Sequence, residues 1–159
     1  MITITSVQDK HNKALAHIIR TSLQEFDIDL NGTVFVDPYL DNMSGHFTVP
    51  TKTYFVAEED GEVIGGSGIG PLDDTSTEVC ELQRMFLTKT ARGKGIGKQL
   101  MAVCLAKAKE MGFKQCYLET FEEMTDAIGL YERSGFRYLD APMGNTGHFA
   151  CKTWMLIDL

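Results

Sequence analysis

Apolar residues recur with two different periods along the first half of the chain, and each period predicts one kind of element. Residues 1–7 alternate apolar and polar side chains, as a strand does. Residues 9–26 carry apolar side chains at helical spacing, which predicts an amphipathic helix. Residues 53–58 and 62–69 read as two strands. The Asp60-Gly61 pair between them is a strong hairpin signal.

The second half alternates strands with helices. The expected strands are residues 79–87, 115–119, 136–139 and 151–157, and the expected helices are residues 95–111 and 125–134. Gly112 and Gly135 follow these helices directly, and glycine is the preferred residue just past a helix end. Strands that first pair in hairpins and then alternate with helices predict a mixed α/β sheet.

The strand at residues 79–87 carries polar side chains where a buried strand would be apolar. Strict alternation divides it into two faces: Glu81, Gln83, Met85 and Leu87 on one, and Cys80, Leu82, Arg84 and Phe86 on the other. We therefore expect a polar group to meet this strand. The strand at residues 62–69 and the position after it are rich in glycine, which predicts a bulge or a close approach to the backbone.

Residues 27–50 have no clear period and mix aspartates with aromatic side chains. Loops of this length are uncommon without a function. The alternatives are a partly packed connection, with a short helix near Pro38, and a loop that binds substrate. Acidic and aromatic side chains would suit an ammonium-bearing substrate.

A glycine-rich turn, Arg92-Gly-Lys-Gly-Ile-Gly97, connects a predicted strand to a predicted helix. Free N–H groups at a helix start, together with the helix dipole, favour an anion, and Lys98 adds positive charge. A P-loop is excluded because Gln99 stands where it needs Ser or Thr. The dinucleotide fingerprint Gly-x-Gly-x-x-Gly also fails, since Lys98 or Leu100 occupies its third glycine position.

The turn does match a third pattern, Arg/Gln-x-x-Gly-x-Gly/Ala. A second motif follows downstream, Ala127-Ile-Gly-Leu-Tyr-Glu-Arg-Ser-Gly-Phe136. The two motifs, in this order and at this separation, resemble those of the GNAT superfamily of acyl-coenzyme A-dependent N-acyltransferases. The resemblance covers about residues 53–138 and is weak over residues 1–50.

The resemblance implies a mostly antiparallel mixed sheet of about six or seven strands flanked by about four helices, with acetyl-CoA as co-substrate. It assigns pantetheine pairing to the backbone of Met85, Phe86 and Leu87. It assigns pyrophosphate binding to Arg92, Gly93, Lys94, Gly95, Ile96, Gly97 and Lys98. One departure is Met124, which stands where many relatives carry an asparagine that contacts pantetheine.

N-acylation by a thioester requires a base for the ammonium and an acid for the departing thiolate. By the resemblance, Tyr131 is the acid and Glu81 the leading base, with its pKa raised by burial. Glu119 and His148 are rival bases, and the intrinsic pKa of a histidine suits that role. The alternatives to catalysis are an ion pair between Glu81 and Arg84, a core tyrosine, and an exposed loop histidine.

Composition narrows the remaining classes. The chain of 159 residues has 43% hydrophobic and 23% charged residues and a net charge of −7, which argues against a nucleic-acid partner. No apolar run approaches the roughly 18 residues of a membrane span. The four cysteines lack metal or disulfide spacing, so we expect reduced thiols in the cytoplasm. We expect no metal, because His11 and His17 do not share a helix face and are expected to be exposed.

The combined expectation is one N-acetyltransferase domain over residues 1–159 that acetylates a small-molecule amine. The alternatives are a protein or peptide amine as acceptor and a non-catalytic module that binds acyl-CoA. A homodimer through sheet edges is the alternative to a monomer. The identity of the acceptor and the acyl-chain preference stay open.

Overall fold

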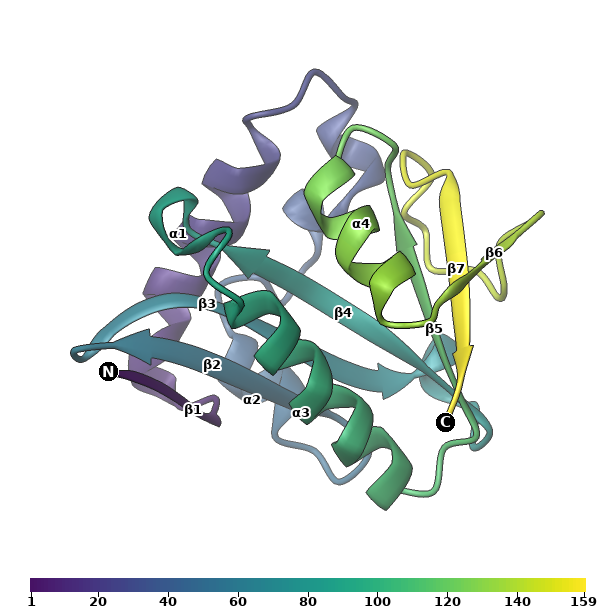
Figure 1. Cartoon of the computed structure of the whole chain (residues 1–159), viewed down its shortest axis with the longest axis horizontal. Helices are drawn as coiled ribbons and strands as arrows, with labels where there is room; N and C mark the ends of the chain where they lie inside the picture. Colours follow the sequence, from purple (N-terminus) through teal and green to yellow (C-terminus); the bar gives the residue numbers. More distant parts are fainter.

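The computed structural model describes all residues from 1 to 159, and it is built on one seven-stranded sheet with strand order β1-β2-β3-β4-β5-β7-β6 (Figure 1). The strands are β1 Ile2–Ser6, β2 Thr53–Glu59, β3 Glu62–Pro71, β4 Val79–Leu87, β5 Gln115–Thr120, β6 Arg137–Leu139 and β7 Thr153–Asp158. Only β4 and β5 pair in parallel. With four α-helices, the predicted mostly antiparallel mixed sheet is confirmed.

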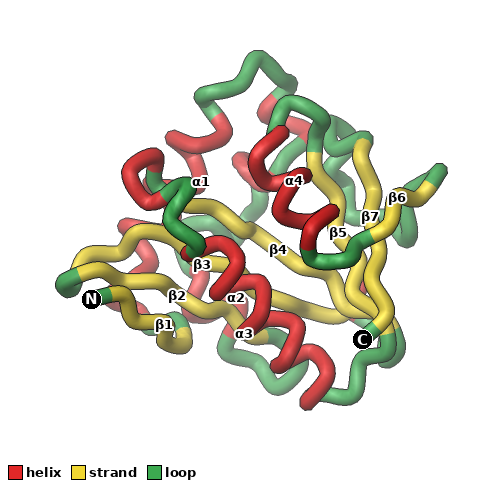
Figure 2. The backbone as a smooth tube through the Cα atoms, viewed as in Figure 1, coloured by secondary structure: helices red, strands yellow, loops and turns green.

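Helices cover both faces of the sheet (Figures 1 and 2). The helices are α1 Asn12–Leu23, α2 Met43–Phe47, α3 Ile96–Glu110 and α4 Thr125–Arg133. One core packs α3 and α4 onto the sheet, through residues such as Leu82, Met101 and Tyr131. A second core lies under α1 and α2, with Leu15 and Phe47 among its buried side chains.

Strands β4 and β5 separate at their carboxyl ends. Their parallel pairing stops at the Glu81–Tyr117 pair, although β4 continues to Leu87 and β5 to Thr120. Figure 1 shows the two strands diverging beyond this point. Backbone groups that face the gap lack a neighbouring strand, so the fold itself opens a cleft in the middle of the sheet.

A β-bulge interrupts β4, and it corrects the predicted faces of this strand. Gly68 pairs with Gln83 and Gly66 with Phe86, so two residues of β4 oppose one residue of β3. Arg84 takes a left-handed conformation with φ of 52°. Strict alternation is therefore wrong beyond Gln83. Glu81, Gln83, Arg84 and Phe86 lie toward α1 and α2, while Cys80, Leu82, Met85 and Leu87 lie toward α3.

The glycines of β3 occur with both features that their number predicts, an irregular register and a close approach to the backbone. Two register shifts occur along this strand, one of them opposite the β4 bulge. A Cβ on Gly66 would lie 2.4 Å from the ring of Tyr54, and one on Gly68 would lie 2.6 Å from it. The predicted hairpin before β3 is also present, with Asp60 and Gly61 both at positive φ.

The segment between α1 and β2 forms two short 3-10 turns, Leu30–Gly32 and Val34–Val36, followed by α2. The predicted helix therefore begins at Met43 and not near Pro38. His11 is buried and its Nε2 lies 3.0 Å from Glu58 Oε1, so the expected exposed position is wrong for His11, whereas His17 is exposed.

All four cysteines are free, and Cys80, Cys104 and Cys116 are buried, as expected for reduced thiols. No helix has the length and apolar character that crossing a membrane would require.

Candidate active site

The glycine turn lies at one end of an open cleft of about 750 Å³ between β4 and α4. Gly93 and Gly95 adopt left-handed conformations, with φ of 76° and 80°, and Gly95 is the N-cap residue directly before α3. No side chain caps this helix start, so its first N–H groups point outward unpaired. The cleft lacks side chains where the two glycines bend, and this fits an anionic group held by backbone amides.

Most of the predicted cofactor residues line this cleft, and two of them do not. The cleft is lined by Met85, Phe86, Leu87, Arg92, Gly93, Gly95, Gly97 and Lys98. Ile96 is buried in the core beside α3, and Lys94 is exposed outside the lining. Met124, at the usual asparagine position, begins α4 and lines the same cleft.

The guanidinium of Arg92 is held by the protein. Its Nη1 and Nη2 donate to the carboxylate of Glu25 at 2.9 and 3.1 Å, and Nε and Nη2 donate to the carbonyl of Leu87. These bonds tie the glycine turn to the end of α1 and to the end of β4. Arg92 therefore shapes the turn, and the exposed cations that line the cleft without an ion pair are Lys98 and Arg133.

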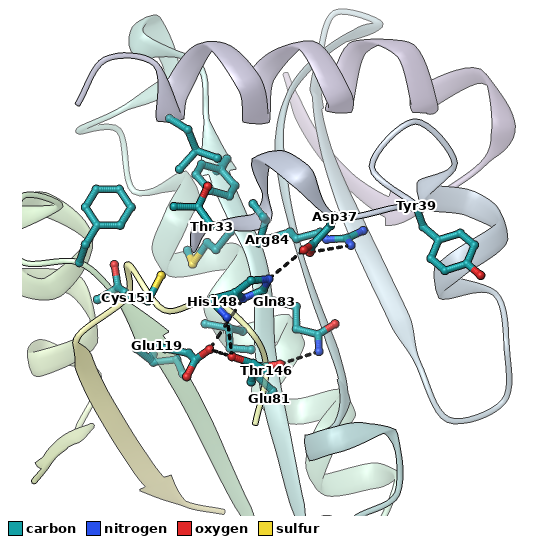
Figure 3. Close-up of a pocket in the computed structure, with 18 of the residues that line it drawn as sticks. Thr33, Asp37, Tyr39, Glu81, Gln83, Arg84, Glu119, Thr146, His148 and Cys151 are labelled. Carbon is teal, nitrogen blue, oxygen red and sulfur yellow. Dashed lines mark hydrogen bonds and ion pairs between the residues drawn. The ribbon is translucent and has the colours of Figure 1, made fainter. Parts of the chain in front are cut away.

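A second cavity of about 330 Å³ lies on the other side of β4 (Figure 3). It shares Met85, Phe86 and Met124 with the first cleft, so the two spaces meet at β4. The remaining walls come from residues 33–46, from the ends of β4 and β5, and from the loop between β6 and β7. The two predicted catalytic side chains, Glu81 and Tyr131, and the rival His148 all line this cavity.

Glu81 is the most perturbed carboxyl group of the cavity. Its side chain is 7% exposed, and Gln83 Nε2 donates to its Oε1 at 2.8 Å. Its pKa is raised to about 7, chiefly by burial and also by the nearby carboxylate of Glu119, while the hydrogen bond from Gln83 opposes the rise. The alternative of an ion pair with Arg84 is not realised, because Arg84 pairs with Asp37. A carboxyl group with this pKa can accept a proton near neutral pH.

His148 is partly buried between two carboxylates, with 19% of its side chain exposed, instead of lying fully exposed in its loop (Figure 3). Its Nε2 lies 2.9 Å from Asp37 Oδ1, and its Nδ1 lies 3.7 Å from Glu119 Oε1. Burial alone would lower its pKa, but the hydrogen bond to Asp37 and the surrounding carboxylates outweigh burial and raise it. The imidazole is thereby biased toward its charged form, which cannot accept a proton.

Glu119 already receives several hydrogen bonds. Tyr117 Oη donates to its Oε2 at 2.7 Å, and Thr146 Oγ1 donates to its Oε1. Together with the nearby His148, these contacts anchor the β6–β7 loop on the end of β5. Glu119 is therefore occupied in holding the loop, whereas Glu81 has only Gln83 as a partner.

Tyr131 projects from α4 and lines the cavity of about 330 Å³. It is 5% exposed, and its ring packs edge-on against Phe136 at 6.0 Å between centroids. Burial raises the pKa of its phenol, with the nearby Cys151 thiol adding to the effect. A phenol of raised pKa keeps its proton at neutral pH, which a general acid requires. The core-packing and catalytic interpretations are compatible, since the ring packs while the side chain lines the cavity.

Sequence reasoning missed two residues of this cavity in their actual roles. Asp37 is the common partner of Arg84 and His148, and Thr146 contacts Glu119. The only sequence signals were the polar residue Arg84 in a buried strand and the aspartates of residues 27–50. Partners so far apart in the chain cannot be paired by local pattern.

Comparisons with known proteins agree with this architecture. The profile of the acetyltransferase (GNAT) family matches residues 15–136. The uncharacterized N-acetyltransferase YjgM of Escherichia coli (strain K12) is 42% identical over 149 residues, covering 93% of this chain and 89% of that protein.

Solved structures are similar in fold. A GNAT-family acetyltransferase of Staphylococcus aureus Mu50 superposes with a TM-score of 0.85 at 21% identity, covering 99% of both chains. The PaiA N-acetyltransferase of Thermoplasma acidophilum, solved in complex with coenzyme A, gives a TM-score of 0.73 at 16% identity, covering 100% of this chain and 99% of that one.

The chain therefore belongs to the GNAT family of acetyltransferases. The predicted class of enzyme, an acyltransferase of this family, is confirmed, as is the family's use of coenzyme A thioesters. The roles of individual site residues stay predictions.

Proposed function

We propose that residues 1–159 act as one N-acetyltransferase domain, which moves the acetyl group of acetyl-CoA directly onto a small-molecule amine. The observation that carries this proposal is Glu81. It is a buried carboxyl group whose pKa lies at about 7, in a cavity that meets the glycine-turn cleft at β4. A non-catalytic module that binds acyl-CoA would need the cleft but not this carboxyl group.

The donor side of the chain fits acetyl-CoA. The outward N–H groups at the start of α3, with Lys98 beside them, suit the pyrophosphate. The backbone of Met85 to Leu87 lines the cleft where β4 has lost its neighbour β5, so it can pair with an extended pantetheine arm as an added strand would. When bound there, acetyl-CoA supplies the activated thioester.

Glu81 is the proposed general base. The acceptor arrives as an ammonium ion, since a primary amine has a pKa of about 10, and it must lose one proton before it attacks. Glu81 takes that proton, directly or through one water molecule. His148 is less available as a base, because its carboxylate neighbours raise its pKa and favour the charged imidazolium, which has no free lone pair.

The β4 bulge and Tyr131 are proposed to serve the later steps. A bulge releases one backbone N–H from the ladder, and such a group next to the thioester carbonyl would stabilise the oxyanion that forms as nitrogen attacks. When the carbon–sulfur bond breaks, Tyr131 gives its phenolic proton to the departing thiolate. The nitrogen loses its second proton as the tetrahedral adduct collapses, and this proton restores the phenol of Tyr131, directly or through water. The products are an acetamide and free coenzyme A, and the proton on Glu81 returns to solvent.

The cavity favours a small cationic acceptor over a protein chain. Asp37, Glu81 and Glu119 bring three carboxyl groups to a volume of about 330 Å³, and further aspartates stand at Asp73 and Asp74. Carboxylates raise the local concentration of cations. A protein or peptide amine is the alternative acceptor, and a cytoplasmic location remains our prediction.

The test is the pH profile of acetyl transfer, with an active amine first found by screening for release of coenzyme A. In the parent protein, kcat should rise through about pH 7 as Glu81 loses its proton, and then level off. Glu81→Gln should lower kcat by about 10²-fold or more at pH 7, with a deficit that shrinks toward pH 10, where the amine deprotonates by itself.

Gln83→Leu is the matched control, because it removes the hydrogen bond to Glu81 while keeping the carboxyl group. It should raise the pKa seen in the profile and preserve most of the plateau rate. A Glu81→Gln profile parallel to that of the parent would exclude Glu81 as base. Saturable binding of acetyl-CoA without transfer to any amine would favour the binding module instead.

A further inference from the structure

At the bulge of β4, one residue adopts a backbone conformation that is unfavourable for any residue with a side chain. Arg84 has φ of 52°, a region in which a side chain is disfavoured and for which glycine is the usual choice at such a bulge. The chain places glycines freely in the neighbouring strand β3, yet it keeps an arginine here. A strained conformation of this kind persists only where contacts with the surrounding residues hold it in place.

The surroundings of Arg84 hold it from two directions. Its guanidinium donates to Asp37 Oδ2 at 3.0 Å and to Met43 Sδ at 3.0 Å, and it lies 5.4 Å from the centre of the Phe47 ring. Its carbonyl accepts a hydrogen bond of 2.6 Å from Tyr54 Oη.

Tyr54 can reach Arg84 only because β3 lacks side chains between them. Its ring is 1% exposed and lies against Gly66 and Gly68, where a Cβ would overlap it. The glycines of β3 thus open a passage from β2 to β4. Asp37, in turn, also binds His148, so the same contacts reach the wall of the acceptor cavity (Figure 3).

We propose that Arg84 is a positioning residue, clamped by Asp37, Met43, Phe47 and Tyr54, that holds the β4 bulge in its left-handed conformation. This inference rests on the proposed function, in which the bulge N–H meets the thioester carbonyl. It gives residues 37–47 a second purpose: besides lining the acceptor cavity, they fix the backbone on the donor side. Arg84 acts through the backbone, not by touching the reacting atoms.

Arg84→Ala and Arg84→Gly form the decisive pair of variants. Both lose the guanidinium contacts, but glycine adopts the left-handed conformation freely and alanine does not. We expect Arg84→Ala to lower kcat by about 10²-fold, close to the loss of one oxyanion donor, and Arg84→Gly to retain about five- to tenfold more activity than the alanine variant. Arg20→Ala, which removes a surface arginine paired with Asp41, should match the parent.

Tyr54→Phe tests the second anchor without removing charge or ring. It should lower kcat about tenfold and leave the KM for acetyl-CoA within about twofold, because the pantetheine groove keeps its shape. Equal losses in Arg84→Ala and Arg84→Gly, or a Tyr54→Phe variant with the kcat of the parent, would overturn the proposal. A rise in acceptor KM alone would assign Arg84 to substrate binding instead.

The clamp is also measured without any acceptor, by amide hydrogen exchange at residues 84–86. Exchange should be faster in Arg84→Ala and Tyr54→Phe than in the parent, and should be unchanged in Arg20→Ala. If the parent protein transferred acetyl to no amine, the proposed function would be refuted. Hydrogen exchange would still show whether Arg84 and Tyr54 hold the bulge in place. Unchanged exchange in both variants would refute the clamp.

Discussion

The proposed donor side and the proposed acceptor side of this protein are constructed in opposite ways. The glycine-turn cleft is lined mostly by two short stretches, residues 85–98 and residues 123–133, and the first of them offers backbone groups at the start of α3. The acceptor cavity collects side chains from residues 33–46, β4, β5, α4 and the β6–β7 loop, and it is held by charged contacts. Acetyl-CoA, which we propose as the donor, can be bound by local backbone geometry. The acceptor, which we expect to differ between relatives, requires side chains that different segments bring together.

The largest effect should follow a change of donor-side backbone. Gly95→Trp forces a bulky residue into a position with φ of 80° at the start of α3, so binding of acetyl-CoA should weaken by 10²-fold or more. Isothermal titration calorimetry with acetyl-CoA measures it. Gly61→Trp is the matched control, because it imposes similar strain, φ of 85°, at the distant β2–β3 hairpin, and there affinity should be unchanged. Equal affinity in both variants would contradict an anion site at the turn.

Tyr131→Phe should slow the chemical step without weakening the binding of acetyl-CoA. Loss of the phenolic proton donor should lower kcat by about 10- to 10²-fold, with acetyl-CoA affinity nearly intact because the ring still packs against Phe136. Steady-state kinetics together with calorimetry give the two values. A kcat equal to that of the parent would remove Tyr131 as the acid.

Asp37→Asn should weaken the binding of the acceptor more than the binding of acetyl-CoA. The carboxylate holds both Arg84 and His148, so its loss should raise the acceptor KM about tenfold and lower kcat, while acetyl-CoA binding changes little. The pKa of His148 should fall, because the hydrogen bond and charge that raise it disappear. NMR titration of the imidazole measures the sign, and an unchanged or higher pKa would refute the arrangement. Asp41→Asn, at an exposed carboxylate that pairs with Arg20, is the control.

The smallest effect should come from a donor-side charge. Lys98→Gln removes an exposed cation beside the cleft, and screening by solvent limits its contribution, so acetyl-CoA affinity should fall about two- to fivefold. The loss should shrink further as salt is raised. An effect as large as that of Gly95→Trp would mean that side-chain charge, and not backbone geometry, forms the donor site.

The sequence predicted the local turns well because each turn is determined by adjacent residues. The glycine turn, the Asp60-Gly61 hairpin and the helix ends at Gly112 and Gly135 each depend on a few adjacent residues with positive φ. The faces of β4 were predicted wrongly beyond Gln83. The bulge that reverses them depends on register with β3, which alternation within one strand does not report.

By itself, therefore, the sequence determined the kind of sheet, the order of its elements and the position of the glycine turn, since hydrophobic period and glycine conformation act over a few residues. Only the tertiary structure decided which side chains share the acceptor cavity. Asp37 and His148 meet although they lie 111 positions apart, and Glu81 acquires its pKa of about 7 from burial by several elements. Burial and electrostatic contact depend on distance in space, and the packing of the whole chain sets that distance.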